Sequence, residues 1–99
     1  MLETFESVAE AIDRANQTRY GLACGVWTND LSQAHQIARD LDAGIVWINK
    51  WLDLSVGAPM GGVKDSGFGR EVHAETLLEF SSPKVVNASL STERPSRWG

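Results

Sequence analysis

Apolar residues recur with helical spacing in two stretches of the chain, and each stretch begins with a capping signal. The sequence Ser7-Val8-Ala9-Glu10 is a capping box, so the pattern behind it predicts a helix over residues 7–19, with Gly21 as its stop. A second capping signal at residues 30–33 begins a helix that should end before Gly44. The apolar positions are Val8, Ala11, Ile12 and Ala15 in the first helix and Leu31, Ala34, Ala38 and Leu41 in the second.

Two short apolar runs flank the second helix and predict strands. Residues 22–28 are mostly apolar, and residues 45–48 read Ile-Val-Trp-Ile, a continuous run typical of a strand covered on both faces. About 16 residues separate the runs, which is long enough for a crossover between parallel strands. The pattern therefore predicts an α/β fold containing a right-handed βαβ unit.

The second half of the chain has weaker periodicity. A loop is expected over residues 49–69, a short helix over residues 71–80, a last strand over residues 83–90 and a polar tail over residues 91–99. Pro83 suits the start of a strand or a sheet edge. A connection as long as 49–69 is more typical of a functional loop than of a simple link.

Composition narrows the class of protein. A chain of 99 residues with 42% hydrophobic and 22% charged residues is expected to be one globular domain, and its net charge of −4 argues against nucleic acid or an anionic membrane as a partner. No apolar run is long enough for a membrane span, and the N-terminus lacks the basic region of a signal peptide. A single cysteine, Cys24, excludes an internal disulfide and fits the reducing cytoplasm. Four tryptophans require more apolar surroundings than so short a chain readily supplies.

The stretch 58–71 concentrates glycine. Four of the nine glycines fall between positions 61 and 69: Gly61, Gly62, Gly67 and Gly69. Glycine loses more conformational freedom on folding than any other residue, so such a cluster predicts turns or close backbone approaches. We refer to residues 58–71 as the glycine loop.

No self-sufficient catalytic motif fits the glycine loop. A phosphate-binding loop begun at Gly62 would need lysine where Phe68 stands, and a dinucleotide fingerprint begun at Gly67 would need glycine at Val72. A nucleophile elbow around Ser66 would need glycine at Lys64. His35 and His73 lie far apart without a cysteine cluster, so no metal site is expected.

Three segments in order resemble the NAD(P)-dependent aldehyde dehydrogenase family. They are residues 18–28, residues 43–49, and residues 59–71, which resemble the family signature P-x-G-G-x-K-x-S-G-x-G-R-E. The resemblance covers about residues 7–90. It implies that the chain is the C-terminal part of an oxidoreductase that converts an aldehyde to a carboxylic acid with NAD or NADP as acceptor.

The resemblance also implies a domain organisation. Residues 1–82 would belong to the catalytic domain, residues 83–90 would form an oligomerisation strand, and residues 91–99 would be a tail. The family's nucleophilic cysteine, general-base glutamate and cofactor contacts would lie upstream of this chain. No catalytic, cofactor-binding or metal-binding residue is therefore assigned here, and the chain alone is expected to bind no cofactor and to be inactive.

A few site residues follow from the family pattern. Leu54 and Met60 match positions that line the substrate funnel, where the family often has aromatic residues, and Asn49 matches the asparagine that closes a strand near the site. Arg70 and Glu71 are expected to anchor the loop, as structural residues near the site together with the four glycines.

Two residues of the matched segments invite other roles. Lys64 is interpreted as a solvated surface charge rather than a substrate contact. Cys24 lies in a predicted buried strand, where cysteine usually behaves as a small hydrophobe, so we do not expect it to be the nucleophile.

An alternative function belongs to a different class. The chain would be a truncated structural or interaction module that associates with itself or binds dehydrogenase subunits through its exposed edge strand and surplus tryptophans. If the chain is instead part of an enzyme, the C-terminal strand is likewise expected to form a homo-oligomer. The identity of the aldehyde, the choice between NAD and NADP, and the oligomer size stay open at this stage.

Overall fold

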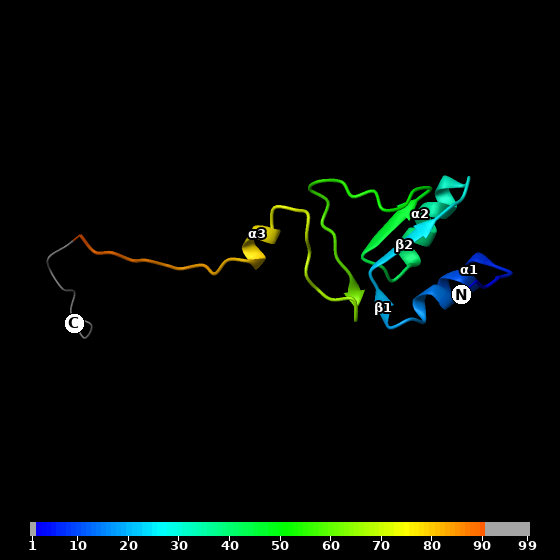
Figure 1. Ribbon diagram of the computed structural model, residues 1–99, viewed down its shortest axis with the longest axis horizontal. Coiled ribbons are helices and arrows are strands. Elements are labelled where there is room, and N and C mark those ends of the chain that lie inside the picture. The colour runs from blue at the N-terminus through cyan, green and yellow to red at the C-terminus, as the bar shows by residue number, and fades with distance from the viewer. Residues whose placement is uncertain (1, 91–99) are drawn as a thin grey trace.

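The computed structural model describes residues 2–90, so the tail expected over residues 91–99 lies outside the described residues (Figure 1). The chain alternates helices and strands in its first half and is irregular in its second. The elements are α1 (Val8–Asn16), β1 (Tyr20–Gly21), β2 (Ala23–Val26), α2 (Leu31–Asp40), β3 (Ile45–Ile48), β4 (Val63–Lys64) and α3 (Thr76–Glu79).

The centre of the fold is a parallel pair of strands. β2 and β3 pair from Ala23 opposite Ile45 to Val26 opposite Ile48, and α2 connects them along the chain. α2 packs against both strands, while α1 packs against α2 (Figure 1). The strand, helix and strand therefore lie as the hydrophobic pattern predicted.

Both long helices begin at the capping residues that the sequence indicated. The Ser7 hydroxyl accepts the backbone N–H of Glu10 at 3.2 Å, and the Asp30 carboxylate accepts that of Gln33 at 2.9 Å. α1 nevertheless ends at Asn16 rather than at residue 19. The Asn16 side chain is used instead to join the helix end to the turn after α2, where it donates to the Asp40 carbonyl and accepts the Asp42 N–H, each at 2.8 Å.

The region expected to be one long loop, residues 49–69, contributes one strand to a small sheet. β1 pairs with β4 in antiparallel fashion, with Tyr20 opposite Lys64 and Gly21 opposite Val63. Gly21 is thus a strand residue and not the stop of α1. Strands of two residues carry no detectable alternation of polar and apolar positions, which is why the sequence pattern missed this sheet.

The helix predicted over residues 71–80 is much shorter. Only Thr76–Glu79 are helical, because Glu71 is held in an isolated β-bridge with Met60 and Val72 has a left-handed φ of 66°. Neither backbone state continues an α-helix.

Residues 83–90 form neither helix nor strand in the described chain, so the last strand is not present in this single chain. Figure 1 shows this segment running away from the folded part, where no strand edge lies beside it. The chain accordingly has a radius of gyration of 23.0 Å, against about 13 Å for a compact chain of this length.

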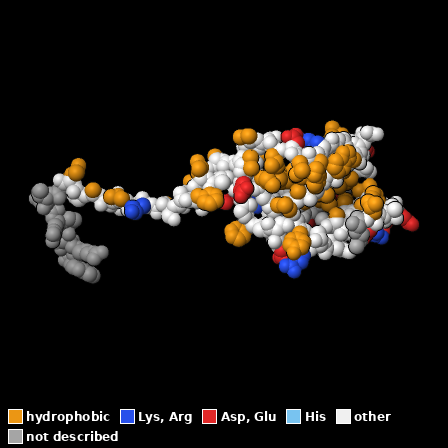
Figure 2. Space-filling model, in the orientation of Figure 1, with side chains coloured by type: hydrophobic (Ala, Val, Ile, Leu, Met, Phe, Trp, Pro, Cys, Tyr) orange, Lys and Arg blue, Asp and Glu red, His pale blue; other side chains and the backbone are white. Residues whose placement is uncertain are grey.

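Few side chains are buried in the described chain. Ala34 at 0% and Trp47 at 4% exposure are its only buried apolar residues. Trp27 and Trp51 remain 63% and 52% exposed, and Figure 2 shows apolar side chains gathered over one face of the folded part. Among the described residues, the chain leaves Trp27 and Trp51 uncovered, in line with the shortage of apolar surroundings expected from its composition. None of the helices within residues 2–90 is long and apolar enough to cross a membrane.

Candidate functional site

The glycine loop surrounds a hollow of about 340 Å³ at one end of the small β1–β4 sheet. Seven of the residues singled out from the sequence meet there: Met60, Gly61, Gly62, Gly67, Gly69, Arg70 and Glu71. Sequence reasoning missed four other lining residues, namely Leu22, Ser66, Glu79 and Phe80. The first two belong to matched family segments, whereas nothing in the pattern marked Glu79 or Phe80.

Backbone contacts hold Met60 at this hollow. Its N–H donates to the Glu71 carbonyl at 2.9 Å, and the Glu71 N–H donates to the Met60 carbonyl at 2.7 Å. Glu71 therefore anchors the loop through its main chain. The position of Met60 is fixed by this bridge, whereas its flexible thioether keeps three rotatable bonds.

Arg70 also stabilises the loop, through hydrogen bonds to backbone carbonyls of the loop itself. Its guanidinium donates to the carbonyls of Phe68 and Gly69 at 3.1 and 2.9 Å, and its backbone N–H donates to the Glu79 carboxylate at 3.2 Å. The Thr76 hydroxyl donates to the Arg70 carbonyl at 3.2 Å. Arg70 thus ties the glycine loop to α3, the short helix that follows it.

Asn49 and Leu54 do not line this hollow. The Asn49 carboxamide accepts the Thr28 N–H and donates to the Thr28 carbonyl, both at 2.9 Å, so it joins the ends of β2 and β3. Its own φ of 55° turns the chain away from β3. Leu54 follows in the next segment with 45% of its surface exposed. Leu54 and Met60 consequently do not form one wall in this chain.

Lys64 is an exposed residue, in line with its interpretation as a surface charge, and it also makes structural contacts. Its side chain is 27% exposed, and its Nζ lies 3.1 Å from the Asp42 carboxylate. The same Nζ donates to the carbonyls of Asn16 and Thr18 at 2.8 and 3.3 Å. Lys64 thereby provides a partner for the Asn16 carbonyl, one of the last carbonyls of α1, which a helix leaves without partners, and for the Thr18 carbonyl just after it.

The glycines of the loop serve two different physical requirements. Gly67 has a φ of 107°, which side-chain-bearing residues rarely adopt, and a Cβ there would meet no atom within 4 Å. Gly61 and Gly62 are instead required by packing, since a Cβ on Gly62 would lie 2.5 Å from the Ser66 Cβ. Gly69 would tolerate a Cβ, at 3.5 Å from the Glu79 carboxylate. Gly44, which the sequence marked only as the end of the second helix, is also required by packing, since a Cβ there would overlap the Gly61 carbonyl.

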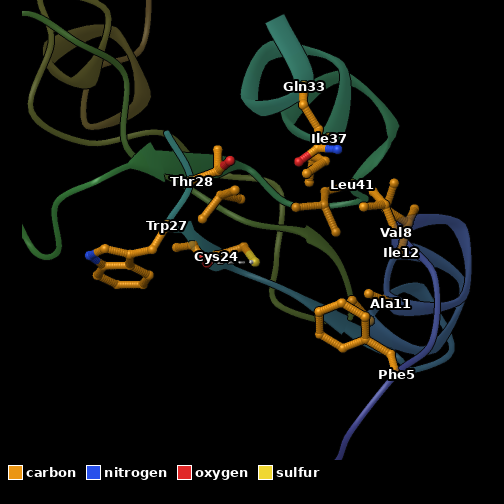
Figure 3. A pocket seen from close by; sticks show the side chains of 13 residues that line it. Phe5, Val8, Ala11, Ile12, Cys24, Trp27, Thr28, Gln33, Ile37 and Leu41 are labelled. Carbon is orange, nitrogen blue, oxygen red and sulfur yellow. Dashed lines mark hydrogen bonds between the residues drawn. The ribbon is translucent and has the colours of Figure 1, made fainter. Parts of the chain in front are cut away.

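Cys24 lies in a separate apolar hollow of about 390 Å³ between α1, β2 and α2 (Figure 3). Phe5 and Ile12 approach it from the α1 side, and Ile37 and Leu41 from α2. Burial raises the pKa of the Cys24 thiol above its usual value. A thiol in this state is a poor nucleophile at neutral pH, which agrees with its reading as a structural residue.

Within residues 2–90, no group of histidine, cysteine or acidic side chains could hold a metal ion. The hollow at the glycine loop offers apolar and backbone surface, with Arg70, Glu71 and Glu79 as its charged lining residues.

The comparisons identify the family. The model of the aldehyde dehydrogenase family matches residues 1–86, so the chain belongs to this family. A betaine aldehyde dehydrogenase of Vibrio vulnificus is 49% identical over 86 residues, covering 87% of this chain and 18% of that enzyme.

Solved structures agree with this assignment. The apo betaine aldehyde dehydrogenase of Staphylococcus aureus superposes with a TM-score of 0.75 at 45% identity, over 79% of this chain and 16% of that one. An NAD⁺ complex of the aldehyde dehydrogenase of Bacillus cereus gives a TM-score of 0.70 at 49% identity, over 74% and 15%. The chain therefore spans less than a fifth of the length of these relatives.

At position 67 the cost of replacing glycine comes from the backbone angle, and it can be measured without a contribution from packing. Gly67→Ala should lower the free energy of unfolding by about 1–2 kcal/mol, because its cost is the backbone angle alone. Gly69→Ala is the matched control, with ordinary contacts and no positive φ, and should change stability by less than about 0.5 kcal/mol. Urea unfolding followed by tryptophan fluorescence measures both, and equal effects of the two substitutions would refute the backbone argument.

The raised pKa of Cys24 predicts slow alkylation. The thiolate is the reactive form, so a raised pKa leaves less of it at a given pH, and the rate with iodoacetamide should increase with pH only above the range of an exposed cysteine. In denaturant the rate should rise to that of a free cysteine. A folded-state rate equal to the denatured rate at neutral pH would contradict the burial of this thiol.

Proposed function

We propose that this chain acts as the C-terminal part of an NAD(P)-dependent aldehyde dehydrogenase that oxidises an aldehyde to a carboxylic acid. The observation that carries the proposal is the family match over residues 1–86, together with the meeting of the residues of the signature segment around one hollow. Residues 1–82 are assigned to the catalytic domain, and the C-terminal segment 83–90 to a strand that pairs with another subunit.

The role proposed for this part is to shape the aldehyde site. Met60 is assigned to the wall of the substrate funnel, and its backbone bridge to Glu71 supports a fixed position there. Leu54 is assigned to another part of the same funnel. Because a thioether and an aliphatic chain replace rings, the funnel would have softer walls than an aromatic one.

The chemical step is proposed to need residues outside this chain. Burial disfavours the thiolate of Cys24, the only cysteine of the chain. The nicotinamide cofactor is assigned to the intact enzyme, in line with the NAD⁺ complex of the Bacillus cereus relative. The exposed apolar face of the described chain is the surface that the remainder of such an enzyme would cover.

This proposal predicts activity only in an intact enzyme. The purified 99-residue chain should give no reduced nicotinamide with NAD⁺ or NADP⁺ and a panel of aldehydes. A chimera in which this chain replaces the matching C-terminal segment of the Staphylococcus aureus betaine aldehyde dehydrogenase should oxidise aldehydes. Turnover by the chain alone, or a folded chimera that binds NAD⁺ without turnover, would count against the proposal.

The funnel assignment is tested in the same chimera. Met60→Ala should raise the KM for an aldehyde about tenfold with little change in kcat, since it removes apolar contact with the substrate. Val56→Ala is the control, because Val56 lies on the same segment with 97% of its surface exposed. Equal effects of the two substitutions on KM would remove Met60 from the funnel.

A second function is favoured by the exposure of the C-terminal segment. Val85 and Val86 are 82% and 79% exposed, so the segment offers apolar side chains for pairing with a second copy or with dehydrogenase subunits. The chain would then be an interaction module. Light scattering on the purified chain decides this, because a monomer at all concentrations, with no affinity for dehydrogenase subunits, would exclude it.

A further inference from the structure

We propose that Trp47 is a positioning residue that sets the place of Leu54, and that it thereby influences which aldehydes are accepted. The inference rests on the proposed function, in which Leu54 lines the substrate funnel. It begins from one contact: the Trp47 indole Nε1–H donates to the Asp53 carbonyl at 2.8 Å. Asp53 immediately precedes Leu54.

Trp47 is suited to hold a neighbouring segment in place. It lies in β3, where it pairs opposite Gly25 of β2, and its side chain is only 4% exposed. Its ring also meets that of Trp51 edge to face, with centroids 4.9 Å apart. A buried indole N–H requires an acceptor, and Asp53 supplies it. The Asp53 carbonyl thus provides a hydrogen-bond partner for the only polar group of the Trp47 side chain.

The segment that Trp47 holds carries backbone strain. Asn49 and Leu52 both have a φ of 55°, and asparagine tolerates this left-handed conformation much better than leucine. The Leu52 side chain is 68% exposed, so its own packing does not explain the unfavourable angle. Such strain persists only where surrounding contacts determine the backbone, and the indole hydrogen bond is one of these contacts.

Leu54 therefore lies between two fixed points. On one side Asp53 is held by Trp47, and on the other the Gly57 N–H donates to the Val72 carbonyl at 2.9 Å. The ion pair between Lys50 and Asp53, at 2.6 Å, adds a solvent-exposed contact on the first side. Exposed ion pairs contribute little, so the indole bond is the principal restraint before Leu54.

The first test uses the full 99-residue chain and NMR. The Trp47 indole proton should exchange with solvent at least about tenfold more slowly than that of Trp27, which is 63% exposed. Trp47→Phe keeps a ring but removes the donor, and should shift the Leu54 methyl signals. Trp51→Phe is the matched control, because it keeps the indole bond and should leave those signals near their native positions.

A rescue distinguishes positioning from general stability. Leu52→Asn relieves the left-handed strain, so adding it to Trp47→Phe should return the Leu54 methyl signals toward their native positions. An unprotected Trp47 indole proton would overturn the proposal even if Trp47→Phe does not fold. Leu54 signals that do not respond to Trp47→Phe would also overturn it.

The second test measures selectivity in the chimera with the Staphylococcus aureus enzyme. Trp47→Phe should change the ratio of KM values for a bulky and a small aldehyde by about tenfold, with kcat changed less than about twofold. Leu52→Asn should partly restore the ratio. An equal loss of kcat/KM for all aldehydes would indicate a structural role only. Inactivity of the unsubstituted chimera would refute the proposed function, while the NMR measurements would still decide the role of Trp47.

Discussion

The parallel pairing of β2 and β3 is the interaction on which the rest of the described chain depends. Parallel strands need cover on both faces because their side chains are apolar on both. α2 provides such cover with Ala34, which is fully buried, and Trp47 of β3 is the other buried apolar residue. α2 and the start of the segment after β3 are placed by contact with this pair, and α1 packs in turn on α2.

The glycine loop is joined by polar ties to segments that flank this strand pair. Lys64 connects it to Asp42 and to carbonyls at and just after the end of α1, and the Ser66 hydroxyl accepts the Gly21 N–H at 3.0 Å. Hydrogen bonds of this kind have directional requirements, so they fix orientation where a small apolar core cannot. The hollow that contains Met60 owes its shape to these ties more than to hydrophobic packing.

The sequence was most informative where periodicity and capping agreed. The starts of α1 and α2 and the strand β3 followed from Ser7, Asp30 and a continuous apolar run. The family signature also located most residues of the hollow. What could not be predicted were backbone contacts between distant segments: the β1–β4 pairing, and the bridge of Met60 to Glu71 that shortens α3. Such contacts depend on three-dimensional neighbours and leave no periodic trace. The contacts of Lys64 were not foreseen for the same reason, since its partners are carbonyls and an aspartate far away in sequence.

The close approach of Gly44 to the Gly61 carbonyl has a mechanical consequence. Where side chains separate two segments, a rotamer change can absorb a displacement of either one. Here backbone meets backbone, so no soft degree of freedom lies between the turn before β3 and the glycine loop. A displacement of that turn would therefore displace the loop directly, and we expect the two segments to move together.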